Sequence, residues 1–72
     1  MKMTRIAAIF RSIFTKRPPE PVIDDLRAHP GTTVFEAADR LGIHWTEVHE
    51  HYGELLFLGL ASRNANLEYT LK

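Results

Sequence analysis

One helix can be followed from its first to its last residue in positions 33–43, which have the sequence TVFEAADRLGI. Thr33 and Glu36 have the spacing of a capping box, in which each side chain accepts a hydrogen bond from a backbone N–H at the start of the helix. Apolar residues repeat at i, i+3, i+4 and i+7 and predict one buried face: Val34, Ala37, Ala38 and Leu41. Gly42 can adopt the left-handed conformation that ends a helix, and Ile43 follows in the turn.

A further helix is predicted on each side of this one. The earlier helix has Pro21 in its first turn and ends before Pro30 and Gly31. The later helix runs from about Trp45 to Leu58. The expected buried faces are Val22, Ile23 and Leu26 in the earlier helix, and Val48, Tyr52, Leu55 and Leu56 in the later one.

Two short strands are predicted after the last helix, at residues 60–63 and 67–71, around the turn Asn64-Ala65-Asn66. Leu67, Tyr69 and Leu71 alternate along the second strand, so we expect them to share one buried face. A chain of 72 residues allows one small domain. The expected fold class is therefore mainly α, with a small C-terminal β-hairpin.

Charge is divided unevenly along the chain, although the net charge is zero. Residues 20–72 contain nine acids against four lysines and arginines, a net charge of −5. Residues 1–19 contain no acid and five cations, namely Lys2, Arg5, Arg11, Lys16 and Arg17. We therefore divide the chain into a basic arm at residues 1–17, a proline linker at 18–21 and a globular domain at 21–72.

Apolar residues of the arm repeat at intervals of three, four and three: Met3, Ile6, Phe10 and Ile13. This spacing predicts a short amphipathic helix, which is too short to cross a bilayer because a crossing needs about 20 apolar residues. Its apolar face could pack on its own domain or pair with a second copy as a dimer helix through Ile6, Phe10 and Ile13. A helix on an anionic membrane surface and a mitochondrial targeting segment are the other interpretations.

The 34–43 pattern and the spacing of Val48, Leu55, Gly59 and Leu60 resemble the winged helix-turn-helix domains of prokaryotic transcriptional regulators. The resemblance covers residues 21–71. It implies a helix-turn-helix in the second and third helices and a wing in the hairpin. The expected architecture is thus a winged helix-turn-helix preceded by the amphipathic helix that the spacing of the arm predicts. The resemblance also implies a DNA-binding regulator that acts as a homodimer, with the third helix of each copy in a major groove.

This first hypothesis assigns contacts with double-stranded DNA to three places. The third helix would face the bases with its exposed side chains: His44, Trp45, Thr46, His49 and Glu50. Arg40 beside the turn, and Arg63 and Asn64 in the wing, would contact the backbone. The cations of the arm would supply further phosphate contacts.

A second hypothesis follows from the acidity of the third helix, which contains Glu47, Glu50 and Glu54 but no lysine or arginine. Such a helix repels phosphates, so the domain could instead be a protein-interaction module that binds a basic patch on a partner. Trp45 would either brace the turn or stand exposed as an anchor. Phe35 and Phe57 lie outside the buried faces and could form an apolar surface for the arm or for a partner.

No catalytic, cofactor or metal site is predicted. The chain has no cysteine, and neither a Gly-rich phosphate loop nor a recognisable nucleophile arrangement is present. His44, Glu47 and His51 share one helical face, but we interpret them as solvated or packed side chains rather than as metal ligands. The absence of cysteine and of a secretory cleavage pattern leads us to expect a cytoplasmic, non-enzymatic protein.

Overall fold

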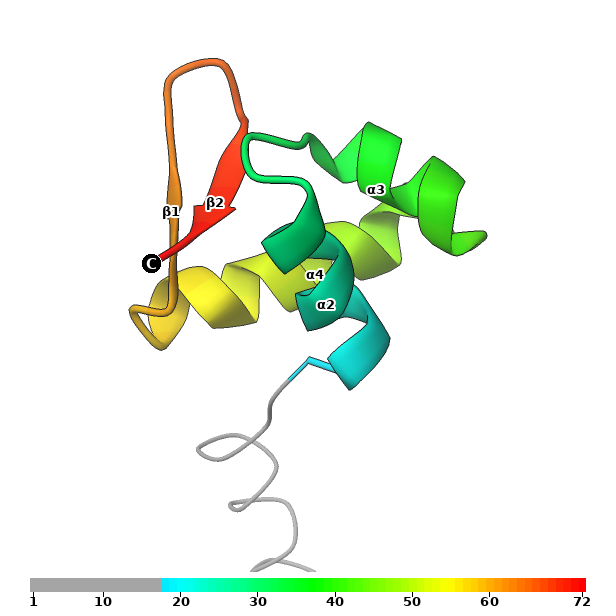
Figure 1. The fold of residues 1–72 in the computed structure, drawn as a ribbon, viewed down its shortest axis with the longest axis horizontal. Coiled ribbons are helices and arrows are strands. Elements are labelled where there is room, and N and C mark those ends of the chain that lie inside the picture. The colour runs from blue at the N-terminus through cyan, green and yellow to red at the C-terminus, as the bar shows by residue number, and fades with distance from the viewer. Residues whose placement is uncertain (1–17) are drawn as a thin grey trace, which may run out of the picture.

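The computed structural model describes residues 18–72, which form three helices followed by a two-stranded antiparallel hairpin (Figure 1). The elements are α2 (Glu20–Ala28), α3 (Val34–Leu41), α4 (Trp45–Phe57), β1 (Ala61–Arg63) and β2 (Tyr69–Leu71). The prediction of a mainly helical chain with a C-terminal hairpin is confirmed. The predicted basic arm with its cations Lys2, Arg5, Arg11, Lys16 and Arg17, and the predicted dimer helix with Ile6, Phe10 and Ile13, lie outside the described residues.

Helix α3 begins and ends as its local sequence predicts. The backbone N–H of Glu36 donates to the Thr33 hydroxyl at 3.2 Å, and the backbone N–H of Thr33 donates to the Glu36 carboxylate at 3.1 Å. At the other end Gly42 has φ +70, a left-handed conformation, and its N–H donates to the carbonyl of Ala38. Both ends are therefore closed by contacts within a few residues.

Helix α2 begins at Glu20, so Glu20 and Pro21 of the predicted linker are helical. Pro19 is the N-cap, with φ −57 and ψ 147, and its carbonyl accepts hydrogen bonds from Val22 and Ile23. A proline in the first turn is compatible with a helix because the N–H that it lacks would have no partner within the helix. The proline-rich segment therefore starts the domain rather than standing apart from it.

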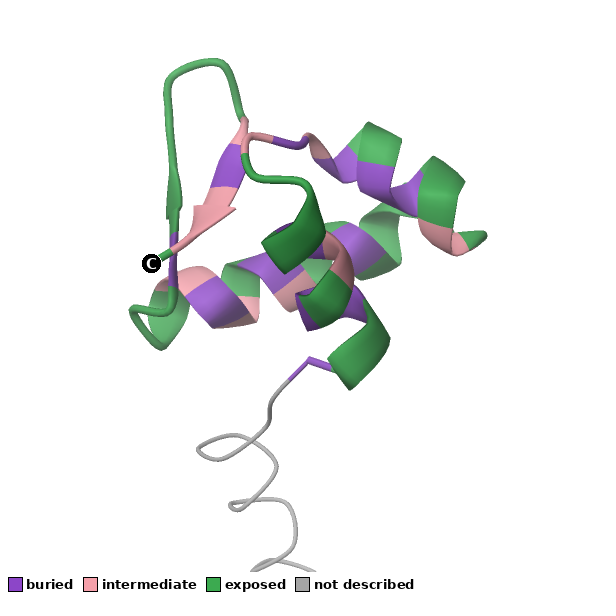
Figure 2. Cartoon of the chain, in the orientation of Figure 1, coloured by how far each residue is buried: buried purple, intermediate pink, exposed green. Residues whose placement is uncertain are grey.

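Helix α3 contacts both α2 and α4, while β1 packs against α4 and β2 packs against α2. Figure 2 shows the buried residues on the faces that the helices turn toward one another, and the loop of the hairpin as exposed. Tyr52 is fully buried, and its ring centroid lies 4.6 Å from that of Tyr69. The core consists of Val22, Ile23, Leu26, Val34, Ala37, Ala38, Val48, Tyr52, Leu55, Ala61 and Tyr69.

The hairpin pairs Ala61 with Leu71 and Arg63 with Tyr69. Tyr69 is also held from the other side, because its N–H donates to the Thr32 carbonyl and its carbonyl accepts from Gly31, both at 2.8 Å. The expected buried alternation is wrong at Leu67, which lies in the turn with 57% of its surface exposed. The turn occupies more residues than predicted, so the second strand begins only at Tyr69.

Within residues 18–72, no helix combines the length and the apolar character needed to cross a bilayer.

Candidate interaction surface

The outward face of α4 is acidic. Glu47, Glu50 and Glu54 are spaced at i, i+3 and i+7, which places them on one side of the helix. The helix contains no lysine or arginine, and none of these three carboxylates is in an ion pair within residues 18–72. This face therefore presents a negative strip to any binding partner.

The start of α4 is held by two residues that the sequence suggested as base contacts. His44 is the N-cap, and its Nδ1 accepts a hydrogen bond from the backbone N–H of Thr46 at 3.2 Å. The Thr46 hydroxyl lies 2.8 Å from the same nitrogen. Since the backbone N–H can only donate, Nδ1 is the acceptor and carries no proton in this arrangement. The contacts between His44 and Thr46 therefore cap the first turn of α4.

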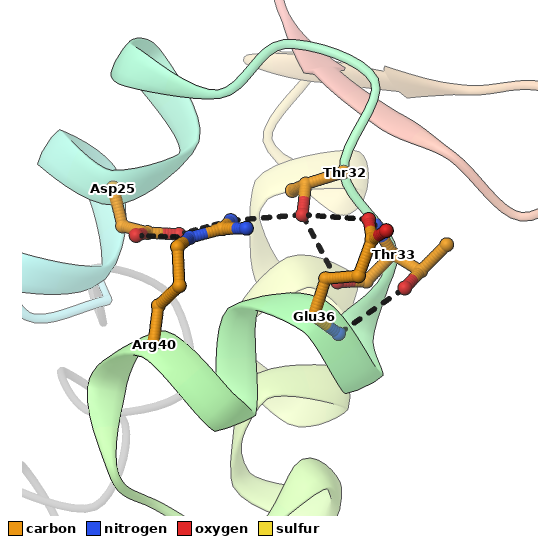
Figure 3. A network of polar contacts seen from close by, with 5 residues as sticks. All are labelled: Asp25, Thr32, Thr33, Glu36 and Arg40. Atoms are coloured by element: carbon orange, nitrogen blue, oxygen red, sulfur yellow. Dashed lines mark hydrogen bonds and ion pairs between the residues drawn. The ribbon is translucent and has the colours of Figure 1, made fainter.

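Arg40 is part of a polar network that joins α2, α3 and the segment between them (Figure 3). Its Nε and Nη2 donate to the two carboxylate oxygens of Asp25, both at 2.8 Å, and Nη2 also donates to the hydroxyl of the buried Thr32 at 2.8 Å. The hydrogen bonds from Arg40 lower the pKa of Asp25. A guanidinium in such a bidentate pair positions two helices and is not free to contact a phosphate without breaking it.

The same network includes the cap of α3. Glu36 accepts from the backbone N–H of Thr33 and from the Thr32 hydroxyl, and the first of these hydrogen bonds is the main reason that the pKa of Glu36 is lowered. Thr32 thus accepts from Arg40 and donates to Glu36. On the side of α3 that carries Arg40, the polar side chains therefore stabilise the fold through hydrogen bonds within the domain.

An apolar groove of about 380 Å³ lies between the start of α3, the start of α4 and the hairpin. Three large apolar side chains beside it are exposed: Phe35 by 60%, Trp45 by 42% and Leu67 by 57%. Trp45 lies against Phe35, with 5.4 Å between ring centroids, and 6.3 Å from His49. We call this the α4–hairpin groove; its lining is Thr33, Val34, Phe35, Trp45, His49, Arg63, Asn66, Leu67 and Tyr69. Trp45 therefore both packs on α3 and presents apolar surface at the groove.

The hairpin side of the groove is fixed by Asn64. Its Oδ1 accepts from the backbone N–H groups of Asn66 and Glu68 at 2.9 and 3.0 Å, and its Nδ2 donates to the Glu68 carboxylate at 2.7 Å. Leu67 follows with φ +61, in the left-handed region that a branched side chain rarely adopts. The turn thus holds an exposed leucine at the edge of the groove in a conformation that costs free energy.

The structure separates the predicted contact residues into two groups. Trp45, His49 and Arg63 line one groove, whereas Glu50 lies on the acidic face of α4 and is not part of the groove lining. The side chains of the second group make hydrogen bonds within the domain: Arg40, His44, Thr46 and Asn64. Leu67 was missed as a surface residue, because its alternation with Tyr69 and Leu71 is typical of a strand. The asparagines at 64 and 66 indicated a turn, but not that it continues through position 67.

Comparisons of the chain with protein-family models, with curated proteins and with solved structures found no match. The resemblance to winged helix-turn-helix domains therefore stays a prediction from the residues themselves.

Proposed function

We propose that this domain is a winged helix-turn-helix unit that serves as a protein-interaction module. It binds a partner segment that places an apolar side chain in the α4–hairpin groove and basic side chains beside α4. The observation that carries the proposal is the exposed rim of Phe35, Trp45 and Leu67 at the groove, in a domain whose helix α4 has acids on another face. Aromatic anchors in an apolar groove are the usual centre of a protein interface, and flanking charge selects the partner.

DNA binding is the competing proposal, and the charge of the domain weighs against it. Arg27 is paired with Asp24 at 2.9 Å and Arg40 with Asp25, which leaves Arg63 and Lys72 as the cations without an ion pair within residues 18–72. Affinity for DNA comes mainly from neutralised phosphates, and the acids of α4 oppose them. A DNA-binding regulator would have to rely on Arg63 and on the cations of residues 1–17.

A pull-down from host lysate with the full chain, with and without nuclease, tests the two proposals against each other. We expect a protein to be captured whether or not nuclease is present, because the contact is with polypeptide. Leu67→Asp should abolish capture by placing a charge at the groove. Phe57→Asp is the matched control, since Phe57 is 81% exposed and lies at the far end of α4, away from the groove lining.

The result that contradicts the proposal is capture that disappears with nuclease and is indifferent to Leu67→Asp. Fluorescence anisotropy with mixed duplexes then measures the competing function directly. Binding that weakens steeply with salt and is unchanged by Leu67→Asp supports DNA recognition through phosphates.

A further inference from the structure

We infer that the α4–hairpin groove recognises an acidic, apolar segment of another protein. One large apolar side chain of that segment enters the groove, and a carboxylate close to it in sequence pairs with Arg63. The inference rests on the proposed function and specifies the segment that fills its groove; the basic side chains of that proposal would contact another face of α4. It is carried by the apolar rim of the groove, by a cation in its lining, and by the position of the acids elsewhere in the described residues.

The groove is suited to an apolar side chain. Among its lining residues Val34 and Tyr69 are buried, whereas Phe35, Trp45 and Leu67 are exposed. A side chain inserted there would remove aromatic and aliphatic surface from water on both sides of the contact. The turn holds Leu67 at φ +61, so this part of the rim is in place before a partner binds.

Arg63 gives the groove its charge. Among residues 18–72, the lining contains this one arginine, no lysine and no aspartate or glutamate. Arg63 is exposed and forms no ion pair with any residue of that range. A guanidinium can hold a carboxylate through two parallel hydrogen bonds, which a lysine cannot do. Because Arg63 and Trp45 line the same groove, one short segment can supply both the apolar anchor and the carboxylate.

The acids of the described residues do not line the groove. On α4, Trp45 and His49 share one side because they are one helical turn apart, whereas Glu50 is rotated by about 100° from His49. Asp39 of α3 lines a separate hollow, and Glu68 accepts a hydrogen bond within the hairpin turn. Salt screens exposed charges beyond about 8 Å at physiological ionic strength. The cation in the lining therefore counts for more at the groove than the net charge of −5 of residues 20–72.

Selection of peptides from a displayed random library on the full chain tests the inference. Peptides that bind the wild-type chain should share a large apolar residue with an aspartate or glutamate close to it in sequence. The same selection on Arg63→Glu should enrich lysine or arginine beside the anchor instead, because the charge of the lining is reversed. Lys72→Glu is the matched control, since Lys72 also has no ion pair within residues 18–72 but is not part of the groove lining. It should select the same peptides as the wild-type chain.

A synthetic, tryptophan-free copy of an enriched peptide gives the quantitative readout. The emission of Trp45, the single tryptophan of the chain, should shift to shorter wavelength as the peptide binds. Arg63→Glu should weaken binding by about tenfold. Replacing the carboxylate of the peptide by its amide should weaken binding to the wild-type chain but not to Arg63→Glu. Leu67→Asp should abolish binding, and far-UV circular dichroism checks that every variant keeps the helices.

Enriched peptides without an acidic preference, or with an acidic preference that Arg63→Glu leaves unchanged, would overturn the inference. If such peptides still fail to bind Leu67→Asp, the groove binds a polypeptide of another kind and the proposed function stands. If no peptide is enriched whose binding depends on Leu67, the inference and the proposed function both fail. Binding of duplex DNA that requires Arg63 but not Leu67 would assign the cation to a phosphate contact and would also reject both.

Discussion

At the scale of single residues, Tyr52 is the largest fully buried side chain within residues 18–72. It is fully buried, and its hydroxyl oxygen has no hydrogen-bond partner within residues 18–72. Burial raises the pKa of Tyr52 to about 12, from an ordinary value of 10.0. The ring stabilises the core through its packing on Tyr69, while the hydroxyl contributes no bond within this part of the chain.

Replacing Tyr52 by Phe should therefore leave the free energy of unfolding at pH 7 unchanged or raise it by up to about 1 kcal/mol. The effect should grow in alkali. The folded state keeps the phenol protonated up to about pH 12, while the unfolded state releases the proton near pH 10. The free energy of unfolding of the wild-type chain should therefore decrease between about pH 10 and pH 12, by about 1 kcal/mol at pH 11. Tyr52→Phe should not show this decrease. Urea unfolding of both chains at pH 7 and pH 11 measures it.

A loss of more than about 1 kcal/mol in Tyr52→Phe at pH 7 would contradict this interpretation, because it would mean that the hydroxyl has a partner in the folded chain. Comparing the two chains at each pH removes the contributions that both chains share. The remaining difference in the free energy of unfolding is then due to the Tyr52 hydroxyl.

At the scale of elements, the helices could be predicted because their signals are local. Thr33, Glu36 and Gly42 define the ends of α3 through contacts that span at most four residues. The partner of Arg40 could not be predicted in this way, since Asp25 lies on another helix and is 15 residues away. From the sequence alone, Arg40 is a candidate for a phosphate contact. In the fold, its side chain instead links two helices.

The hairpin turn could not be predicted for a different reason. Its shape depends on the Asn64 side chain, which holds Asn66 and Glu68 by hydrogen bonds, and on a left-handed backbone at Leu67. Alternating apolar residues predict a strand when the sequence contains no recognisable signal for such a turn. The α4–hairpin groove could not be predicted either, because Leu67 is one of its three exposed apolar side chains.

The hairpin offers a test of whether Leu67 is kept for binding at the expense of stability. Leu67→Gly should raise the free energy of unfolding by about 0.5–1 kcal/mol, because glycine adopts a positive φ without steric cost. It should also weaken binding at the α4–hairpin groove, since the exposed apolar side chain is lost. Thermal unfolding measures the first effect, and the pull-down measures the second.

The control is Leu67→Ala, which removes most of the side chain but keeps the Cβ atom that disfavours a positive φ. It should weaken binding as much as glycine does without the gain in stability. If glycine destabilises the hairpin, the leucine side chain contributes packing that outweighs the backbone strain, and the turn is not kept for recognition alone.

At the scale of the whole molecule, the first and last described elements close the domain. Strand β2 packs against α2, and Tyr69 is bonded to Gly31 and Thr32 in the segment that follows α2. The 11 hydrophobic residues of the core cluster all lie between positions 22 and 69. The effect of removing residues 1–17 can therefore be examined against a core that the described residues form.

Deleting residues 1–17 should leave a domain that unfolds cooperatively, because every element that forms the core cluster is retained. Calorimetry and circular dichroism measure this directly.

A shortened chain without a cooperative transition would contradict the separation of arm and core. It would mean that the arm covers part of the body, with the buried Pro18 as the point where that contact begins. A folded shortened chain would leave two exposed apolar surfaces for a partner, the α4–hairpin groove and the far end of α4 with Phe57, Leu58 and Leu60. Each outcome therefore assigns the apolar surface of the domain to a different contact.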